Sequence, residues 1–168
     1  TLINSIGDNE IRSLINDMFL DDAVDFLEEL PAGVVKRVLQ NTDPGTRNLI
    51  NQFLRYPENS AGSIMTIEYM EVHASMTVDE TMALIRRVGL DKETIYTIYV
   101  IDEQRKLLGT IPLRKLILAD GSARAGDLME TGVASVTTTD DQEKVAEVVR
   151  HYDLMAIPVV DQEGRLVG

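Results

Sequence analysis

The sequence predicts an α+β fold in which a small superhelical bundle of helices precedes two copies of one β-α-β-β unit. The first observation is a phrase that occurs twice, at residues 98–109 and 157–168, with Ile, Val, Asp, Leu and Gly at matching places and no gap. The second is that apolar residues over residues 1–56 recur with the spacing of short helices. Self-similarity at a long period indicates tandem units, and it fixes the architecture before any other feature is considered.

Each copy of the phrase predicts a buried strand, a polar turn after an Asp, and a second short strand that ends at Gly. Upstream of each copy lies a short motif, Ile64-Met65-Thr66 or Leu128-Met129-Glu130, followed by a Val-containing strand and an amphipathic helix. The expected strands are residues 70–72 and 134–136, and the expected helices are residues 78–88 and 141–152. A further helix over residues 113–118 makes the first unit β-α-β-β-α, whereas the second unit stops at Gly168, before such a helix.

Four short helices are predicted before the repeats. Ser5 or Asp8 is expected to cap a first helix that runs to Met18. The other three are expected at residues 21–30, 32–40 and 46–55. Short helices joined by tight turns indicate a small superhelical bundle. Residues 57–63 contain Pro, Asn, Ser and Gly, a composition that predicts a linker.

The composition excludes several classes of function. The 168 residues include no Cys, which rules out disulfides, zinc–thiolate sites and a thiol nucleophile. The net charge of −12 argues against nucleic acid and against an anionic membrane surface, and it permits hard cations, which take oxygen ligands. Residues 1–8 lack a basic start and a long apolar stretch, so we expect no signal peptide, and no apolar run approaches the roughly 20 residues that span a bilayer. Because it starts in a polar segment and stops within the second unit, we expect it to be part of a longer chain.

The repeated unit resembles a tandem pair of CBS domains, a regulatory module that works as an intramolecular pair. The resemblance covers about residues 64–168. It depends on the Asp-x-x-x-x-Leu-h-Gly phrase (h, hydrophobic), which is repeated at this spacing with a helix between the copies. A plain αβ repeat without ligand function is the alternative.

Four segments together resemble the cytosolic part of the MgtE magnesium transporter/channel family. They are residues 20–25 (LDDAVD), 56–66 (YPENSAGSIMT), 93–96 (ETIY) and 152–153 (YD). The resemblance covers essentially the whole chain, and segment 56–66 is its most specific part. The domains it implies are a helical N domain lacking its first helices at 1–56, a linker at 57–63, CBS repeat 1 at 64–124 and CBS repeat 2, incomplete at its C-terminal end, at 125–168.

Two acids of the second helix, Asp21 and Asp25, are spaced i, i+4, so their carboxylates share one helix face. Spacing alone favours a solvated acidic face. The resemblance to MgtE implies instead that both bind Mg²⁺ at the interface between the N domain and the CBS pair. On the CBS side it implies carboxylate ligands at Asp141, Glu143 and Asp153, and backbone carbonyl ligands at Ser63 and Arg150.

The acids of the second repeat also have plainer explanations. Helix N-termini favour acids, which accounts for Asp141 and Glu143, and Asp153 suits a loop. At Arg150 the cationic side chain would have to point away from the metal.

A nucleotide site is expected to be weak. CBS pairs often bind adenine nucleotides between the repeats, through a ribose-binding phrase that resembles Gly-h-h-Thr/Ser-x-x-Asp. The first repeat has Gly109-Thr110-Ile111-Pro112-Leu113-Arg114-Lys115 at this place. Pro112 removes the hydroxyl and Lys115 removes the carboxylate, although Arg114 can still meet a phosphate. We therefore expect ATP to bind weakly or not at all.

The resemblance to MgtE implies a regulatory, non-enzymatic Mg²⁺-sensing region on the cytoplasmic face of a membrane magnesium transporter. Without Mg²⁺ the acids of the N domain and of the CBS pair would repel one another, and the linker would let the N domain swing away. Bridging Mg²⁺ would favour the closed arrangement, which the resemblance implies shuts the pore. One alternative is an adenine-nucleotide-sensing CBS module. Another is a fragment of a CBS-regulated enzyme, but the sequence has no P-loop, dinucleotide or Ser-His-Asp signature.

A homodimer through the CBS domains is the expected assembly. The repeat helices carry more apolar residues than one sheet per unit would cover. They are Met82, Leu84, Ile85 and Val88 in the first helix and Val145, Val148 and Val149 in the second. Two chains are therefore expected to pack as a symmetric pair. The other expected partner is the transmembrane pore domain of the same chain, which lies outside this sequence.

Overall fold

The first helix begins after a glycine rather than after a polar cap. The computed structural model describes residues 7–168, without the side chain of Asp8, and the expected cap Ser5 lies outside that range. Helix α1 (Asp8–Asp17) starts at Asp8, and the Gly7 N–H donates to the Glu10 carboxylate at 3.0 Å. The cap expected at Asp8 is therefore wrong by one position, because that residue is already helical.

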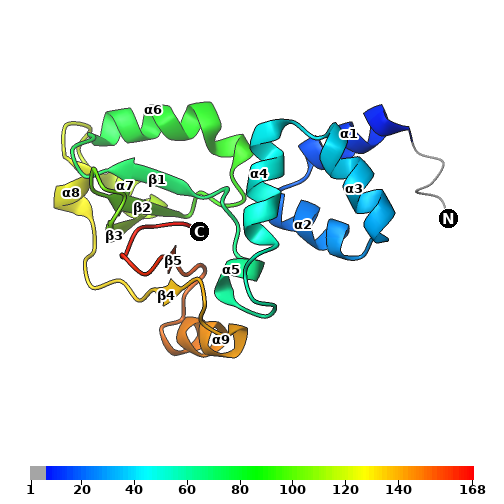
Figure 1. Cartoon of the computed structure of the whole chain (residues 1–168). Coiled ribbons are helices and arrows are strands. Elements are labelled where there is room, and N and C mark those ends of the chain that lie inside the picture. The colour runs from blue at the N-terminus through cyan, green and yellow to red at the C-terminus, as the bar shows by residue number, and fades with distance from the viewer. Residues whose placement is uncertain (1–6) are drawn as a thin grey trace.

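The next three helices lie where the sequence predicts them, and all four gather on one side of the molecule (Figure 1). They are α2 (Leu20–Glu28), α3 (Ala32–Asn41) and α4 (Pro44–Phe53). Asp43 caps α4 by accepting the Thr46 N–H at 2.9 Å, and Pro44 occupies the first helical position, where no backbone donor is needed. Helix α1 packs against α3, and α2 packs against α4, which agrees with the predicted superhelical bundle.

Part of the expected linker is structured. Helix α5 (Ala61–Ile64) begins inside residues 57–63, and both Ser60 and Ala61 are buried. This stretch is bound to the second repeat, since the Ala61 N–H donates to the Asp140 carbonyl at 2.7 Å. Residues 57–63 are therefore not a free linker throughout, because small residues permit close backbone contact as well as flexibility.

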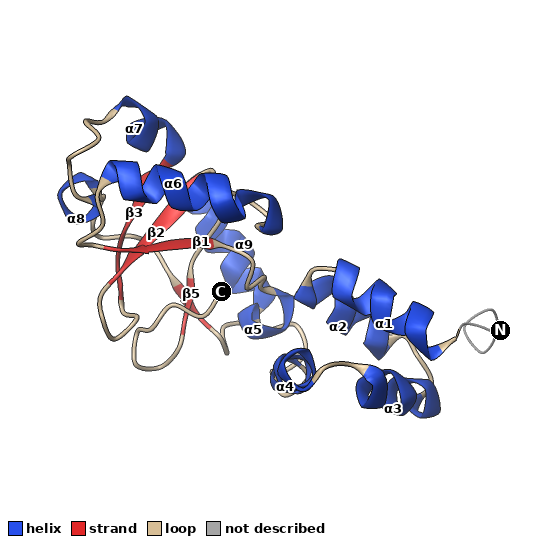
Figure 2. Cartoon of the chain, turned by 90° about the horizontal axis from the view of Figure 1, so that it is seen from above, coloured by secondary structure: helices blue, strands red, loops and turns tan. Residues whose placement is uncertain are grey.

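The first repeat forms a three-stranded sheet. Its elements are β1 (Met70–His73), α6 (Val78–Val88), the 3-10 turn η2 (Gly89–Asp91), β2 (Thr97–Ile101), β3 (Leu107–Pro112) and α7 (Leu113–Leu118). In the order β1-β2-β3, β1 is parallel to β2 and β3 is antiparallel to it. Thr77 and Glu80 form a capping box at the start of α6, which covers one face of this sheet (Figure 2). The predicted β-α-β-β-α order is confirmed here.

The second repeat is less regular. Its elements are α8 (Ala125–Leu128), β4 (Val136–Thr137), α9 (Gln142–His151) and β5 (Val159–Val160), with β4 and β5 parallel. The short strand predicted at the end of the second phrase is reduced to two isolated antiparallel bridges, Val160 with Leu166 and Lys106 with Arg165. Backbone hydrogen bonds still join the two halves of the phrase, from the Val159 N–H to Gly168 at 2.8 Å and from the Asp161 N–H to Arg165 at 2.9 Å. The Leu166 N–H donates to the Arg105 carbonyl of the first repeat at 2.9 Å.

The two repeats cross over at two equivalent places. The segment after α8 pairs with β3 through two backbone hydrogen bonds, of 3.0 and 2.8 Å. Met129 in that segment packs against Gly109, and Met65 packs in the same way against Gly168. The Met upstream of repeat 2 thus packs against the Gly that ends the phrase of repeat 1, and the Met upstream of repeat 1 packs against the Gly that ends the phrase of repeat 2.

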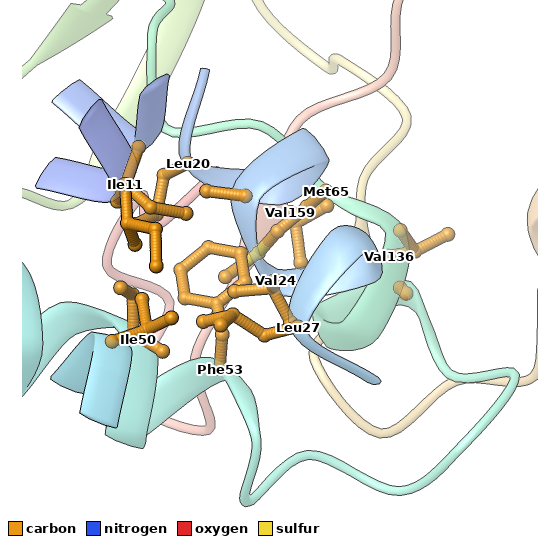
Figure 3. Close-up of a cluster of buried hydrophobic side chains, with 13 residues drawn as sticks. Ile11, Leu20, Val24, Leu27, Ile50, Phe53, Met65, Val136 and Val159 are labelled. Atoms are coloured by element: carbon orange, nitrogen blue, oxygen red, sulfur yellow. The ribbon is translucent and has the colours of Figure 1, made fainter. Parts of the chain in front are cut away.

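Buried apolar side chains form two main clusters. One belongs to the first repeat and includes Ile98 and Ile111. The other contains the inner residues of α1 to α4 together with Met65, Val136 and Val159 (Figure 3). The helical bundle and the second repeat therefore share one core, while the first repeat has a core of its own.

Candidate metal interface

The start of α2 lies against the first repeat. The Leu20 N–H, one of the donors that a helix N-terminus leaves free, donates to the Glu68 carboxylate at 3.3 Å. Glu68 also accepts the Thr66 hydroxyl at 2.9 Å, and its backbone carbonyl accepts the Glu93 N–H at 2.9 Å. The first turn of α2 therefore lies beside Glu68 and Glu93, two acids of repeat 1.

Asp21 has one buried carboxylate oxygen without a partner at this contact. Its side chain is half-buried, and its Oδ1 atom is buried without a hydrogen-bond partner. Burial is the main cause that raises the pKa of Asp21; backbone N–H groups of the same turn partly lower it, and the charge of Glu93 raises it again. A buried carboxylate oxygen without a partner is costly, and a cation placed beside it would remove that cost.

Asp25 follows one turn later and is exposed. The i, i+4 spacing places it on the same side of α2 as Asp21. Among the interactions of the described residues, its carboxylate makes no hydrogen bond or ion pair. One member of the predicted pair is thus held at a domain joint, and the other is open to solvent.

The acids expected on the CBS side lie along the outer face of α9. Asp141 caps this helix by accepting the Glu143 N–H at 2.8 Å, which is the plain structural role considered for it. A surface groove of about 650 Å³ follows this face and is lined by Asp141, Glu143, Lys144, Ala146, Glu147 and Arg150. Because the Arg150 side chain lies on the same face as the acids, its cation offsets part of their charge.

The remaining two predicted positions lie just outside α9. Asp153 follows the helix with a φ of 50°, a left-handed conformation that Asp tolerates, and its side chain is exposed. Ser63 lies in α5, and its hydroxyl donates to the Ser60 carbonyl at 2.9 Å. The carbonyl of Ser63 belongs to a helix end, where carbonyls lack helical partners and are open to a ligand.

The structure keeps the two sets of acids apart. Among the described side chains, no group of three His, Asp or Glu residues lies close enough to hold one metal ion. The α2 set adjoins repeat 1, and the α9 set lies on the surface of repeat 2. These residues permit several ions with few protein ligands each, which is how Mg²⁺ binds when it keeps most of its water.

Three acids at these places were not predicted as ligands: Glu68, Glu93 and Glu147. Glu147 is spaced i, i+4 from Glu143, so helix periodicity could have indicated it. Glu93 lies in one of the segments that carry the family resemblance, but only the fold brings it to Asp21. Glu68 has no local signal in the sequence.

A separate cleft of about 550 Å³ lies between α7 and the second repeat. It is lined by Tyr96, Pro112, Leu113, Arg114, Ile117, Leu118 and Met155. The walls are mostly apolar and Arg114 is the only charged lining residue, a combination that suits a flat base with a phosphate attached. Lys115 does not line the cleft, and its ammonium lies 3.5 Å from the Glu130 carboxylate.

The helix residues on which the dimer was predicted are mostly used within the chain. Ile85 is buried in the core of repeat 1, where Met82, Leu84 and Val88 pack against it, and Val145 and Val148 pack against the shared core. The argument that α6 lacks cover is therefore wrong. Exposed large apolar side chains gather instead around α7; they are Tyr96, Ile117, Leu118 and Met155.

Comparison with known proteins agrees with this two-part fold. Residues 1–59 match the family model of the MgtE intracellular N domain, and residues 61–121 and 125–168 match that of the CBS domain. A crystal structure of the cytosolic domain of the Mg²⁺ channel MgtE in complex with ATP has a TM-score of 0.93 and 41% identity, covering 99% of this chain and 68% of that one. The chain belongs to the MgtE family.

Two curated relatives of this MgtE chain are magnesium transporters. MgtE of Thermus thermophilus is 45% identical over 153 residues, which is 89% of this chain and 34% of the relative. MgtE of Bacillus subtilis is 32% identical over 167 residues, which is 99% of this chain and 37% of the relative. The chain thus spans about a third of the length of these relatives. Every helix within residues 7–168 is too short or too polar to cross a membrane.

The comparisons confirm the predicted family and the predicted order of a helical N domain before a CBS pair. They also agree with a non-enzymatic role for this MgtE chain, because it matches the intracellular N domain of MgtE and the CBS domain.

Proposed function

We propose that this MgtE chain is the Mg²⁺-sensing cytosolic region of a membrane magnesium transporter. Mg²⁺ bound between the N domain and the CBS repeats favours the arrangement that closes the pore. Relatives named as magnesium transporters and the match to an intracellular N domain support this proposal.

The observation that carries the proposal is the buried, unpartnered oxygen of Asp21 at the joint between the N domain and repeat 1. The nearby charge of Glu93 makes the joint more negative. Like charges a few ångströms apart repel by roughly 1 kcal/mol per pair even in water. A hydrated divalent cation would change that repulsion into attraction, and carboxylate oxygens are the ligands that Mg²⁺ takes.

The exposed positions would hold further, weaker ions. Asp25, Glu143 and Asp153 are exposed, so each would contribute one carboxylate to an ion that keeps its other waters. The carbonyls of Ser63 and Arg150 would add neutral oxygens. Since the Arg150 side chain shares the groove with Asp141, we expect the α9 site to be weaker than the Asp21 site.

Small-angle scattering during a Mg²⁺ titration tests the proposal. A ligand shifts a conformational equilibrium only by its preference for one state, and several weak ions acting together supply that preference. We expect the chain to become more compact as Mg²⁺ rises. An unchanged radius of gyration across a roughly 20-fold range in the millimolar region would contradict the proposal.

Paired substitutions assign the effect to the predicted acids. We expect Mg²⁺ to protect the linker predicted at residues 57–63 from protease, and Asp25→Ala with Glu143→Ala to abolish that protection. Glu28→Ala with Asp127→Ala is the matched control, because it also removes two exposed acids, one from α2 and one from the CBS region. Equal loss of protection in both double variants would mean that net charge, rather than these sites, controls the response.

Adenine-nucleotide sensing is a second candidate, favoured by the cleft beside Arg114 and by the ATP in the 41% identical structure. That structure weighs against the expectation, based on Pro112 and Lys115, that ATP binds weakly or not at all. Calorimetric titration with ATP separates the two. If the wild-type chain is saturated at micromolar ATP and the Arg114→Ala variant is not, the cleft is a nucleotide site. If the wild-type chain gives no heat of binding at that concentration, the original expectation of weak or no ATP binding is supported.

A homodimer through the CBS region also remains a proposal. The exposed apolar surface around α7 supports it, in place of the α6 residues first predicted. Light scattering at tens of micromolar should give the mass of two chains, and Leu118→Asp should shift it to one. A monomer in the wild-type chain would contradict this assembly.

A further inference from the structure

The end of the expected linker is bound along the loop that leads into α9. Three backbone hydrogen bonds of 2.7–2.9 Å join the two segments: Ala61 N–H to Asp140, Gly62 N–H to Thr138, and Gln142 N–H to Asn59. Between them, Ser60 and Asp141 form an antiparallel bridge. Residues 59–62, which contain the bridge residue Ser60 and the start of α5, are therefore bound along residues 138–142.

We infer that residues 59–62 are a strap that belongs to the second CBS repeat, so that the N domain pivots only on residues 54–58. The inference rests on the proposed function, because a pivot matters only if the N domain moves. Residues 54–58 are exposed except for the half-buried Tyr56. The backbone hydrogen bonds found at this stretch stay within residues 50–60 and do not reach repeat 2.

Asn59 sets the path by which the chain enters the strap. Its φ of 61° lies in the left-handed region, which Asn and Gly adopt more readily than other residues and β-branched residues adopt least. Its side-chain oxygen also accepts a hydrogen bond from the Gln142 amide group at 3.2 Å. Both the backbone conformation and the side-chain contact thus suit Asn here.

Gly62 brings the strap into contact with the pivot. A Cβ at this position would lie 2.7 Å from ring carbons of Tyr56 and 2.9 Å from the Thr138 carbonyl. Tyr56 in turn packs edge-to-face on Phe53, the last residue of α4, with ring centroids 5.9 Å apart. A tilt of α4 would therefore press the Tyr56 ring against the strap.

The strap also adjoins the proposed Mg²⁺ ligands. Gln142 donates its backbone N–H to the Asn59 carbonyl, and it lies between Asp141 and Glu143 in the chain. Ser63 directly follows the strap. An ion on this face of repeat 2 would thus act on the base of the pivot rather than on a loose linker.

Hydrogen exchange of the whole chain, with and without millimolar Mg²⁺, tests the strap. We expect the amides of Ala61, Gly62 and Gln142 to exchange slowly and equally in both conditions, while those of Arg55 and Tyr56 slow when Mg²⁺ is added. Strap amides that become slow only with Mg²⁺ would overturn the inference, because the pivot would then include residues 59–62.

The same data separate this inference from the proposed function. If no amide responds to Mg²⁺, Mg²⁺ sensing by this chain is refuted. The strap is then judged on the amides of Ala61 and Gly62 alone: slow exchange supports it, and exchange at the rate of an unfolded chain overturns it.

Two substitutions at one position give a matched comparison. Asn59→Gly and Asn59→Val both lose the contact with Gln142, but only Val resists the left-handed conformation. We expect strap amides to keep wild-type rates in Asn59→Gly and to exchange about five- to thirtyfold faster in Asn59→Val, the factor that the cost of a left-handed residue implies. Unchanged exchange at Val100 would show that repeat 1 stays folded. Equal acceleration in both variants would overturn the role given to the left-handed turn.

Discussion

Helices α6 and α9 occupy the same position in the two CBS repeats, yet they differ in burial. Val78, Thr81 and Ile85 of α6 are buried, whereas no residue of α9 is. The sheets differ in the same sense, with three strands in repeat 1 and two strands of two residues each in repeat 2. Repeat 1 has its own core, which also includes Ala125, whereas Val136 and Val159 of repeat 2 belong to the core of the N domain.

The sequences of the two helices account for much of this difference. Five large apolar residues are distributed along α6, but the only large apolar residues of α9 are Val145, Val148 and Val149, and the rest of that helix is mainly charged. Repeat 2 therefore cannot build a separate core and completes one with the N domain. The domain proposed to move thus helps to stabilise the repeat that carries most of the predicted CBS-side ligands.

Removing the Phe53 ring should give the largest effect and the most direct test of this comparison. Phe53 is 3% exposed within the shared core. We expect Phe53→Ala to destabilise the N domain and repeat 2 together by about 4 kcal/mol. Native-state hydrogen exchange should show Val159 losing protection with the N domain while Val100 keeps it. Ile111→Ala should show the reverse, and equal loss at Val100 and Val159 in both variants would mean that the two cores unfold as one.

The glycines at the two crossovers should differ in their tolerance of a methyl group. A Cβ at Gly109 would lie 2.5 Å from the backbone oxygen of Glu130, whereas the three atoms nearest to a Cβ at Gly168 all belong to the flexible side chain of Met65. We expect Gly109→Ala to cost about 3 kcal/mol and Gly168→Ala about 1 kcal/mol, because side chains yield more readily than backbone. Urea denaturation measures both.

Gly33→Ala is the control for these two substitutions. Gly33 lies in α3 with no atom near its absent Cβ, so the change should raise the free energy of unfolding by up to about 1 kcal/mol. If Gly109→Ala destabilised the chain no more than Gly168→Ala, the contact between β3 and the segment after α8 would be less tightly packed than it is in the structure.

Repeat 1 contributes charge to the N-domain joint, and Asp21→Asn tests that contribution. Without Mg²⁺ we expect this variant to be more stable by about 1 kcal/mol, or roughly 2–4 °C in Tm, because it removes a buried charge and adds amide donors. Burial raises the pKa of Asp21, so the advantage should vanish at pH values low enough to protonate Asp21 in both the folded and unfolded chain.

Mg²⁺ should make the wild-type chain the more stable of the two, because it stabilises the wild-type chain more than it stabilises the Asp21→Asn variant. Glu28→Gln, an exposed acid at the other end of α2, is the control and should respond to Mg²⁺ like the wild type. Wild-type and Asp21→Asn chains that gain equally from Mg²⁺ would exclude Asp21 as a ligand.

The sequence was most informative where structure is local. The repeated phrase predicted β2, β3 and β5, and apolar spacing predicted the helices, because these signals depend only on neighbouring residues. Contacts between distant segments were not predictable in this way. Spacing placed Asp21 and Asp25 on one face but did not reveal that Asp21 meets Glu93 of repeat 1. Likewise, a linker-like composition did not show that residues 59–62 pair with repeat 2.

The smallest expected effect concerns one turn position that the two repeats fill differently. Arg105 in repeat 1 and Gly164 in repeat 2 have left-handed φ values of 65° and 79°. The Arg105 guanidinium donates to the Glu71 carboxylate at 2.7 and 2.8 Å and to the Leu166 carbonyl of repeat 2 at 3.3 Å. Repeat 1 thus tolerates a strained residue at a turn where its side chain contacts the other repeat.

Substitutions at Arg105 separate the strain from the contact. Arg105→Ala keeps the left-handed strain and loses a half-exposed ion pair, for a cost of about 0.5–1 kcal/mol. Arg105→Gly loses the same pair but relieves about 1 kcal/mol of strain, so we expect its urea midpoint to match that of the wild type. Gly164→Ala should cost about 1 kcal/mol, because it introduces that strain where no side-chain contact offsets it. If Arg105→Gly were as destabilising as Arg105→Ala, the left-handed turn would carry no measurable cost in repeat 1, and the two turns would differ only in their side-chain contacts.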